Sequence, residues 1–305
     1  MYIYLPITEM AINIFSLIGL GGGVGFLSGM LGVSGGFLLT PILILMGIPS
    51  SIAVASQSAG VIATSTTGTI NHWRKKNVDI KMALYVFIGG FSGSSLGVWV
   101  FTILRSMGNL DATIKLTYVI FLGAVSFLMF TELFNTRRKQ QKYVRTKLHQ
   151  HNWMHRLPFK TRFKKSRLYI SIIPPIAIGF FIGFLSALMG VGGGFIMVPA
   201  MIYMLGMHTS VVVGTSLFQG IFVALNATFW QAYVNHTVDF ILAFTLIIGG
   251  VVGAKLGVKT AGKLKAEQLR FILAFVVSSV AIALFIELVV QPEFIYNIVY
   301  TKGAN

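Results

Sequence analysis

Long uncharged runs dominate the pattern of hydrophobic and polar positions in this sequence. Residues 10–73 and 168–238 contain no Asp, Glu, Lys or Arg. A helix that crosses a bilayer needs about 20 apolar residues, so each run has room for several crossings. A spanning β-barrel would instead show alternating segments of about ten residues, and no such alternation occurs. The pattern therefore predicts an all-α polytopic membrane protein in contact with the lipid bilayer.

The pattern of the first half of the chain returns in the second half. Residues 25–41 (GFLSGMLGVSGGFLLTP) align with residues 183–199 (GFLSALMGVGGGFIMVP), and ten positions are identical. Internal repeats of this kind are common in secondary transporters. We predict two homologous transmembrane repeats and a connecting basic cytoplasmic loop, which occupy residues 1–134, 169–305 and 135–168, respectively.

The distribution of charge predicts that the two repeats are inverted. Loop 71–81 holds four basic residues and its counterpart 231–241 holds none, whereas 105–115 holds two and its counterpart 255–270 holds five. A further 12 of the 24 Lys and Arg residues lie in 135–168. Cytoplasmic loops are enriched in Lys and Arg, and opposite polarity requires an odd number of crossings per half. We expect inverted repeats of five crossing helices each, with both termini outside.

The apolar segments also predict where these helices lie. The expected helices cover about 10–31, 36–47, 51–71, 82–104 and 113–134 in the first half, and 170–189, 194–206, 209–230, 240–257 and 267–290 in the second. The second helix of each half is too short to cross a bilayer alone at 1.5 Å per residue. The number of crossings per half depends on these two helices, because their length is equally compatible with half-helices or re-entrant segments.

Composition narrows the class of protein further. Only 10% of the 305 residues are charged, whereas about a quarter are charged in soluble domains. The net charge of +16 is concentrated in one loop without a recognition fold, so the positive-inside rule for a cytoplasmic loop explains this charge better than nucleic-acid binding does. The chain has no cysteine and its six histidines fall in loops or at helix ends. We therefore expect no metal site and no cofactor.

Glycines in this sequence are of two kinds. Those at four-residue spacing, such as Gly21, Gly25 and Gly29, predict close helix packing in lipid. The clusters GVSGG at 32–36 and GVGGG at 190–194 instead separate two helices. Glycine permits turns that other residues resist, and the start of a helix offers an anion its unpaired N–H groups and dipole. The alternative is a tight turn between packed helices. The candidate substrate-binding residues are Gly32, Ser34, Gly35, Gly36, Gly190, Gly192, Gly193 and Gly194.

Neutral polar residues early on the third helix of each half are further candidates for substrate binding. Their side chains can complete the coordination of an oxyanion without holding it too tightly for release. The alternative is interhelical hydrogen bonding, which is common for such residues in membranes. The residues of this group are Ser56, Gln57, Thr215, Ser216 and Gln219.

Four carboxylates occupy equivalent positions in the two halves. Asp79 and Asp239 precede apolar helices, where we expect them to act as N-caps. Glu132 and Glu287 lie near helix C-termini, where the dipole disfavours a carboxylate. Acidic residues inside a membrane are functional candidates by default, so we regard these two as candidates for ion coupling.

The repeated glycine clusters, each followed by a proline (Pro41 and Pro199), resemble the sulfite exporter TauE/SafE family of membrane permeases. VVVGTSL at 211–217 and GGVVGAKLG at 249–257 extend the resemblance to about residues 11–290. The resemblance implies transport of sulfite, sulfoacetate or related organosulfonates across the bacterial inner membrane. The first half departs from the family pattern at Ser34 and in ASQSA at 55–59, which leaves the substrate open.

An enzyme is a remote alternative. GSSLG at 93–97 fits the G-x-S-x-G pattern, and GFSG at 90–93 resembles the serine motif of intramembrane proteases. The strand-turn-helix context of a hydrolase is missing, and the second half has no serine at these positions. We therefore predict no enzymatic activity.

The predicted function is export of a small anion by alternating access. An interior-negative membrane favours the exit of each negative charge by about 2.3 kcal/mol per 100 mV. Import of sulfonates or other organic anions and an anion channel are the alternatives. Besides the anionic substrate, a second copy of the chain is a candidate partner.

Overall fold

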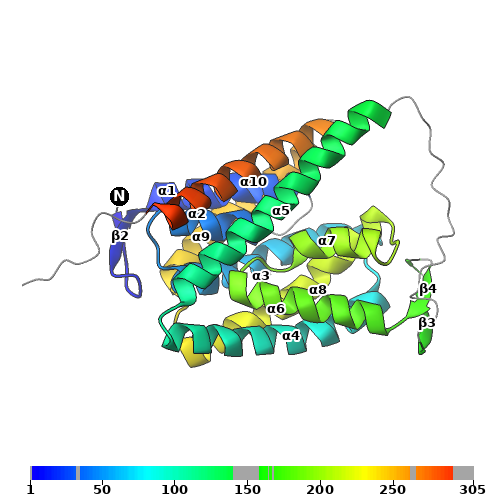
Figure 1. The fold of residues 1–305 in the computed structure, drawn as a ribbon, viewed down its shortest axis with the longest axis horizontal. Helices are drawn as coiled ribbons and strands as arrows, with labels where there is room; N and C mark the ends of the chain where they lie inside the picture. The colour runs from blue at the N-terminus through cyan, green and yellow to red at the C-terminus, as the bar shows by residue number, and fades with distance from the viewer. Residues whose placement is uncertain are drawn as a thin grey trace, which may run out of the picture.

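The computed structural model describes residues 2–31, 35–139, 158–163, 165–166, 168–261 and 266–290 (Figure 1). In the first half these residues form β1 (Tyr2–Leu5), β2 (Met10–Asn13), α1 (Ile14–Leu31), α2 (Gly36–Leu45), α3 (Ser50–Arg74), α4 (Ile80–Ser106) and α5 (Leu110–Lys139). The second half contains β3 (Lys160–Phe163), β4 (Leu168–Ser171), α6 (Ile173–Met189), α7 (Gly194–Tyr203), α8 (Thr209–Trp230), the π-helix η2 (Gln231–Asn235), α9 (Phe240–Ala261) and α10 (Ala266–Val289). The all-helical prediction is confirmed.

Each half begins with a short antiparallel hairpin that the sequence did not predict. In β1–β2, Leu5 pairs with Met10, and in β3–β4, Phe163 pairs with Leu168. Leu5 and Phe163 are fully buried, so each hairpin places one apolar side chain against the helices. The second hairpin begins inside the segment predicted as a loop. The two hairpins lie at opposite ends of the molecule (Figure 1), here termed the β1–β2 end and the β3–β4 end.

The two halves interlock rather than pack side by side. α1 packs on α9 and its repeat equivalent α6 packs on α4, while α3 packs on α8 and α5 on α10. Phe37 and its equivalent Phe195 stack with their ring centroids 4.0 Å apart. Equivalent elements thus meet each other around an approximate two-fold axis. The arrangement is compatible with inverted repeats.

Glycines explain how closely the interlocked helices approach. A Cβ atom at Gly25 would lie 2.4 Å from the Gly250 carbonyl oxygen, and one at Gly183 would lie 2.3 Å from the Gly90 carbonyl oxygen. Real Cβ atoms do not reach such distances, so these positions require glycine for backbone contact. The prediction that glycines at helical spacing pack helices together is confirmed.

The α1–α2 pair enters and leaves at the same end of the molecule. α1 begins directly after β2, and the position of a Cβ at Gly47, just beyond α2, is 3.8 Å from Met10 of β2. In the second half, Leu205 and Met207 beyond α7 share a core with Phe163 of β3. Of the alternatives that the sequence left open for α2 and α7, this geometry favours re-entrant segments over a crossing by all five helices of each half. Since a re-entrant pair adds no net crossing, three crossings remain, and their odd number preserves the opposite charge polarity of the halves.

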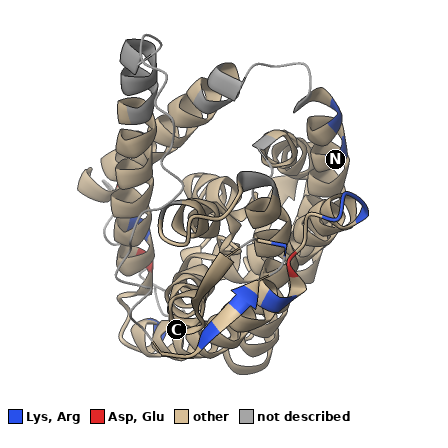
Figure 2. Ribbon diagram, turned by 90° about the vertical axis from the view of Figure 1, so that its right-hand side faces the viewer, with Lys and Arg blue, Asp and Glu red and all other residues tan. Residues whose placement is uncertain are grey.

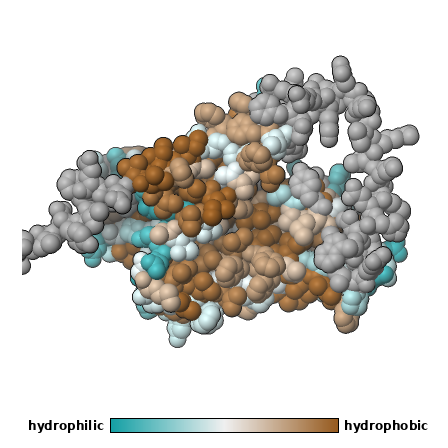
Figure 3. Space-filling view, in the orientation of Figure 1, coloured by the Kyte–Doolittle hydropathy of each residue, from teal (hydrophilic) through white to brown (hydrophobic). Residues whose placement is uncertain are grey.

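The surface and the charges agree with a multi-pass membrane protein. The helical segments Ile80–Ser106, Leu110–Thr131, Val211–Asn235, Phe240–Thr260 and Phe271–Val289 are long and apolar enough to cross a bilayer. Apolar side chains cover much of the face in Figure 3. Figure 2 looks at the β3–β4 end, where Lys and Arg gather. There, Lys165 Nζ donates to the Val78 carbonyl at 2.9 Å, which joins the basic loop after α3 to the second hairpin.

Candidate functional site

The last glycine of the first cluster meets the second glycine turn beside the middle of α3. A Cβ at Gly36, the first residue of α2, would lie 2.6 Å from the Gly190 carbonyl oxygen and 2.8 Å from that of Val191. It would also lie 2.9 Å from Val61, near the middle of α3. α2 and α7 therefore begin side by side, and the N–H groups of a first turn have no carbonyl partner in a preceding turn of their helix. Of these groups, the Leu38 N–H donates to the Gly35 carbonyl at 3.3 Å and the Gly194 N–H donates to the Gly192 carbonyl at 2.8 Å. Two positive dipole ends consequently meet inside the membrane protein.

The second turn requires its glycines for their conformation. Gly190, Gly192 and Gly193 have φ angles of 69°, 74° and 69°, in the left-handed region that side chains resist. Gly190 also lies against the backbone of Val54 in α3, because a Cβ there would be 2.7 Å from the Val54 carbonyl oxygen. In the first turn, Gly35 has a right-handed φ of −68°. Gly32 and Ser34 lie outside the described residues.

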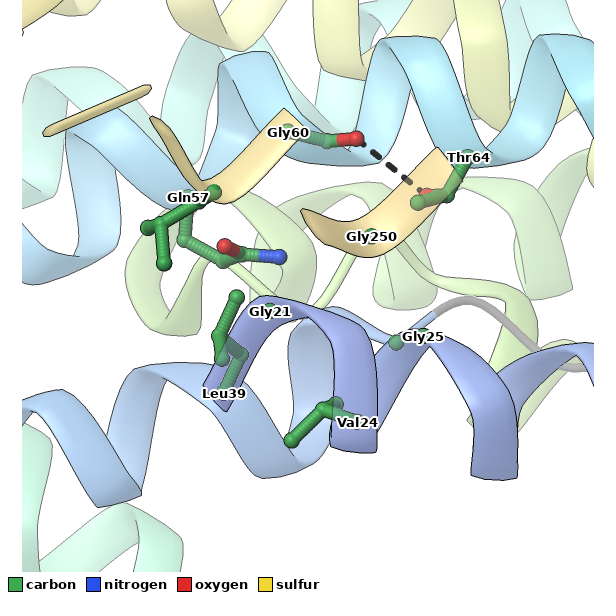
Figure 4. Close-up of a pocket in the computed structure, with 10 residues that line it drawn as sticks. Gly21, Val24, Gly25, Leu39, Gln57, Gly60, Thr64 and Gly250 are labelled. Carbon is green, nitrogen blue, oxygen red and sulfur yellow. Dashed lines mark hydrogen bonds between the residues drawn. The ribbon is translucent and has the colours of Figure 1, made fainter. Parts of the chain in front are cut away.

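A small cavity lies beside the start of α2 (Figure 4). Residues of α1, α2, α3 and α9 line it, including Val24, Leu39, Gln57, Gly60 and Gly250. Gln57 is 2% exposed and its Oε1 atom has no hydrogen-bond partner. Figure 4 shows its amide directed into the cavity. The cavity has room for about one water molecule, so a larger ligand requires the helices to separate.

The equivalent space in the second half is filled. Gly60 aligns with Gln219, and Gly250 aligns with Gly90. The Gln219 side chain, 2% exposed, lies against α4: a Cβ at Gly90 would be 2.6 Å from Gln219 Nε2. Gln57 aligns with Ser216, whose hydroxyl donates to the Val213 carbonyl of its own helix at 3.0 Å. The cavity of the first half thus has no open counterpart among these residues.

Comparison with known proteins agrees with this architecture. The family model described as "Sulfite exporter TauE/SafE" matches residues 17–284. The chain belongs to the TauE/SafE family. It is 30% identical to the probable membrane transporter protein YjnA of Bacillus subtilis over 265 residues, which are 86% of this chain and 96% of that protein. A probable membrane transporter protein of Xylella fastidiosa is 29% identical over 245 residues, 77% of this chain and 79% of the relative. No solved structure matches the chain significantly.

In this TauE/SafE protein, two residues predicted to bind substrate join helices of opposite halves. The Asp239 N–H donates to Ser56 Oγ at 2.9 Å, and the Asp79 N–H donates to Thr215 Oγ1 at 3.1 Å. These hydrogen bonds are repeat equivalents of each other. They show the interhelical role that the sequence left open as the alternative, whereas contact with substrate stays a prediction.

Asp79 and Asp239 are N-caps, as predicted. Asp79 Oδ1 accepts from the Met82 N–H at 3.2 Å, and Asp239 Oδ1 accepts from the Leu242 N–H at 3.1 Å. Each carboxylate also binds a hairpin, which the sequence did not indicate. Asp79 Oδ2 accepts from the Ser166 hydroxyl at 2.6 Å, and Asp239 Oδ2 accepts from the Ile7 N–H at 3.2 Å. One carboxylate in each half therefore positions a helix start and a hairpin together.

Of the two candidate coupling residues, the structure describes the side chain of Glu287 only. Glu287, near the end of α10, forms an ion pair with Lys115 near the start of α5, with 2.7 Å between Oε1 and Nζ. The Glu132 side chain lies outside the described residues. Since Glu287 already has a cationic partner, the structure gives it a role in joining α5 to α10, and ion coupling stays a prediction.

The serines of the protease alternative have packing roles. Ser92 donates to the Gly89 carbonyl of its own helix at 2.9 Å. Ser94 and Ser95 accept from the Asn226 amide of α8 at 2.8 and 2.9 Å.

Tyr118 of α5, which the sequence did not single out, donates its hydroxyl to the carbonyl of Met189, directly before the second glycine turn.

Proposed function

We propose that this TauE/SafE protein exports a small sulfur-containing oxyanion, such as sulfite, sulfoacetate or a related organosulfonate, across the bacterial inner membrane. The observation that carries the proposal is the contact of Gly36 with Gly190 and Val191, because it brings the starts of α2 and α7 together. Helix starts at mid-membrane bind anions through unpaired N–H groups and the helix dipole.

The surroundings of these helix starts suit an anion that must also be released. Every residue that lines the cavity beside α2 is uncharged. Rotation of the Gln57 amide presents an NH₂ donor to the cavity, while its buried Oε1 atom lacks a partner in the present arrangement. Neutral donors bind an oxyanion less tightly than an Arg or Lys side chain would. We therefore place the anion between Gln57 and the first turn of α2.

Alternating access explains how the anion reaches this enclosed place. The cavity is too small for sulfite in the present structure, because it has room for about one water molecule. Movement of the re-entrant pairs α1–α2 and α6–α7 against the crossing helices would open it toward one end at a time. The membrane potential favours export, since the exit of a negative charge is downhill by about 2.3 kcal/mol per 100 mV.

Flux through proteoliposomes tests the proposal. Vesicles containing the purified full chain and loaded with sulfite should release it saturably, faster with an interior-negative potential, and should show counterflow. Gly36→Ala should abolish flux because its Cβ would contact the Gly190 carbonyl, whereas the matched variant Gly19→Ala should retain it because no atom lies within 4 Å of that Cβ. Non-saturable conductance would indicate a channel, and uptake driven by a coupled ion would indicate an importer.

A further inference from the structure

Buried polar atoms without a partner concentrate on the two central helices. Of eight such side-chain atoms in the described part of the chain, six belong to α3 and to α8 with its extension η2. Buried polar groups in folded proteins are almost always paired, so each exception needs an explanation. Gln57 belongs to the cavity described above. The other five are Ser65 Oγ, Thr69 Oγ1, His72 Nδ1, Thr228 Oγ1 and Gln231 Nε2.

On α3 these atoms form a stripe from the centre to the β3–β4 end. Ser65, Thr69 and His72 follow each other at spacings of four and three residues, which places them on one helix face. Ser65 Oγ is 3.7 Å from the Cβ position of Gly220, which is itself 3.2 Å from the Gly192 carbonyl oxygen of the second turn. The Cβ of His72 is 3.0 Å from the Cβ position of Gly214, in the first turns of α8.

A repeat-equivalent stripe runs in the opposite direction on α8. Thr228 and Gln231 align with Thr69 and His72, at the same offset that relates Ser56 to Thr215. Gln231 Oε1 accepts from the Asn235 amide at 2.9 Å and from the Thr237 hydroxyl at 3.3 Å, while its Nε2 has no partner. Since Thr237 is close in sequence to Asp239, which binds the first hairpin, this stripe approaches the β1–β2 end.

Neighbouring hydroxyls on α3 behave differently. Thr64, Thr66 and Thr67 donate to backbone carbonyls of their own helix at 3.2, 2.7 and 2.9 Å. This is the usual solution for a hydroxyl on an apolar helix. Ser65 and Thr69 belong to the same helical turns, yet their hydroxyls have no partner. The composition of α3 alone therefore does not account for the stripe.

We propose that the two stripes line two half-paths for the anion, which rests on the proposed function. Ser65, Thr69 and His72 connect the central site to the β3–β4 face, and Thr228 and Gln231 connect it to the β1–β2 face. Both half-paths are closed in this structure. When one opens, water or the oxyanion supplies the missing hydrogen bonds. A pair of half-paths related by the repeat is the arrangement that alternating access requires, because each conformation hydrates one stripe.

Cysteine labelling tests the half-paths without any transported anion. The natural chain has no cysteine, so single substitutions Thr69→Cys and Thr228→Cys report alone. Adjacent Ile70 and Phe229, which are 49% and 61% exposed on the apolar surface, provide matched controls as Ile70→Cys and Phe229→Cys. Full-chain variants would be reconstituted with one orientation and treated with an impermeant methanethiosulfonate on either side. Only a hydrated thiol forms the reactive thiolate.

We expect Thr69→Cys to react only from the β3–β4 side and Thr228→Cys only from the opposite side. Each should react at least about tenfold faster than its lipid-facing neighbour, because that neighbour has no access to water. If both are as inert as the controls, or if both react from the same side, the half-paths are refuted. Ser65→Cys, which exchanges only oxygen for sulfur, replaces Thr69→Cys if that variant does not fold.

The same vesicles separate this result from the proposed function. Sulfite flux through the unsubstituted chain tests whether the anion is transported, whereas sided labelling tests where water enters. Labelling on the expected sides with no sulfite flux would refute sulfite as the substrate and leave the half-paths in place. Flux without sided labelling would refute the half-paths alone.

Discussion

The two halves of the molecule share their helices but differ at the centre. In the first half, Gly60 leaves a cavity beside the start of α2, and the buried Gln57 amide faces into it. In the second half, Gln219 takes the place of Gly60 and its side chain lies against α4 at Gly90. The two copies of the scaffold thus differ at this position by one side chain, which lies against α4 in the second half and is absent beside the cavity of the first.

Equivalent glycines in the two turns also differ in backbone conformation. The second turn has three left-handed glycines, and the Tyr118 hydroxyl binds the Met189 carbonyl directly before it. The first turn ends in a right-handed Gly35, and Ser34 stands where the second half has Gly192. A left-handed Gly193 beside a filled space and a right-handed Gly35 beside an open one indicate unequal roles for the two halves. We therefore propose that the second half stabilises the centre and that the first half binds the anion.

Among the changes that compare the two halves, filling the cavity of the first half should have the largest effect. Gly60→Gln gives the first half the side chain that fills the second, so we expect sulfite flux to fall by at least about tenfold through loss of space for the anion. The neighbour of a Cβ at Gly60 is the flexible end of Gln57, at 3.2 Å, so the fold should tolerate the change. Proteoliposome efflux measures the outcome.

The reciprocal substitution is the control for this comparison. Gln219→Gly empties the second space, which has Ser216 where the first has Gln57. Because the Ser216 hydroxyl already donates to Val213, we expect no second binding site and flux within about twofold of the natural chain. Equal losses in both variants would show that the two halves contribute alike, and the comparison would fail.

Much of the fold was predictable because hydrophobic runs and glycines carry strong signals. α8 spans Thr209–Trp230, as the uncharged run indicated, and Asp79 and Asp239 cap the helices that follow them. The hairpins were not predictable, because four-residue strands such as KTRF have too few positions to distinguish them from a basic loop. The direction of α2 could not be predicted from the sequence either. A length of ten residues excludes a full crossing but does not say to which side the chain returns.

The sequence predicts the parts of the site that depend on a side chain or a glycine motif. It does not predict the part that depends on the missing side chain of Gly60. The repeated glycine turns and Gln57 were candidates because of their chemistry and spacing. Gly60 gave no such signal, since the lack of a side chain matters only once α1 and α9 are known to lie beside it. Ser65 and Thr69 likewise resemble the other hydroxyl residues of α3 in the sequence. Only the structure shows that the Thr64 and Thr66 hydroxyls donate to backbone carbonyls of their own helix and that the Ser65 and Thr69 hydroxyls have no partner.

A smaller effect should separate the two turns. Gly193→Ala places a Cβ at a φ of 69° and 3.0 Å from Ile182, so we expect a loss of about 1–2 kcal/mol in the free energy of unfolding. Gly35 has a φ of −68°, and the Cβ of Gly35→Ala meets only side chains, Ser28 at 3.3 Å and Val24 at 3.5 Å, so its loss should be less than half as large. Thermal unfolding in detergent compares them. A larger loss for Gly35→Ala would show that the first turn is the constrained one.

The smallest effect tests whether Tyr118 fixes the second turn. Tyr118→Phe removes the hydroxyl that binds the Met189 carbonyl and leaves the fully buried ring in place, so the apolar packing of α5 is retained. A hydrogen bond of this kind contributes about 0.5–1.5 kcal/mol, and the loss of stability should lie in this range. If the second turn must stay fixed for transport, flux should fall more than stability predicts.

Tyr169→Phe, in the exposed part of β4, removes a hydroxyl far from the turn and should change neither quantity. Unchanged flux in Tyr118→Phe would mean that the three left-handed glycines hold the turn without help from α5.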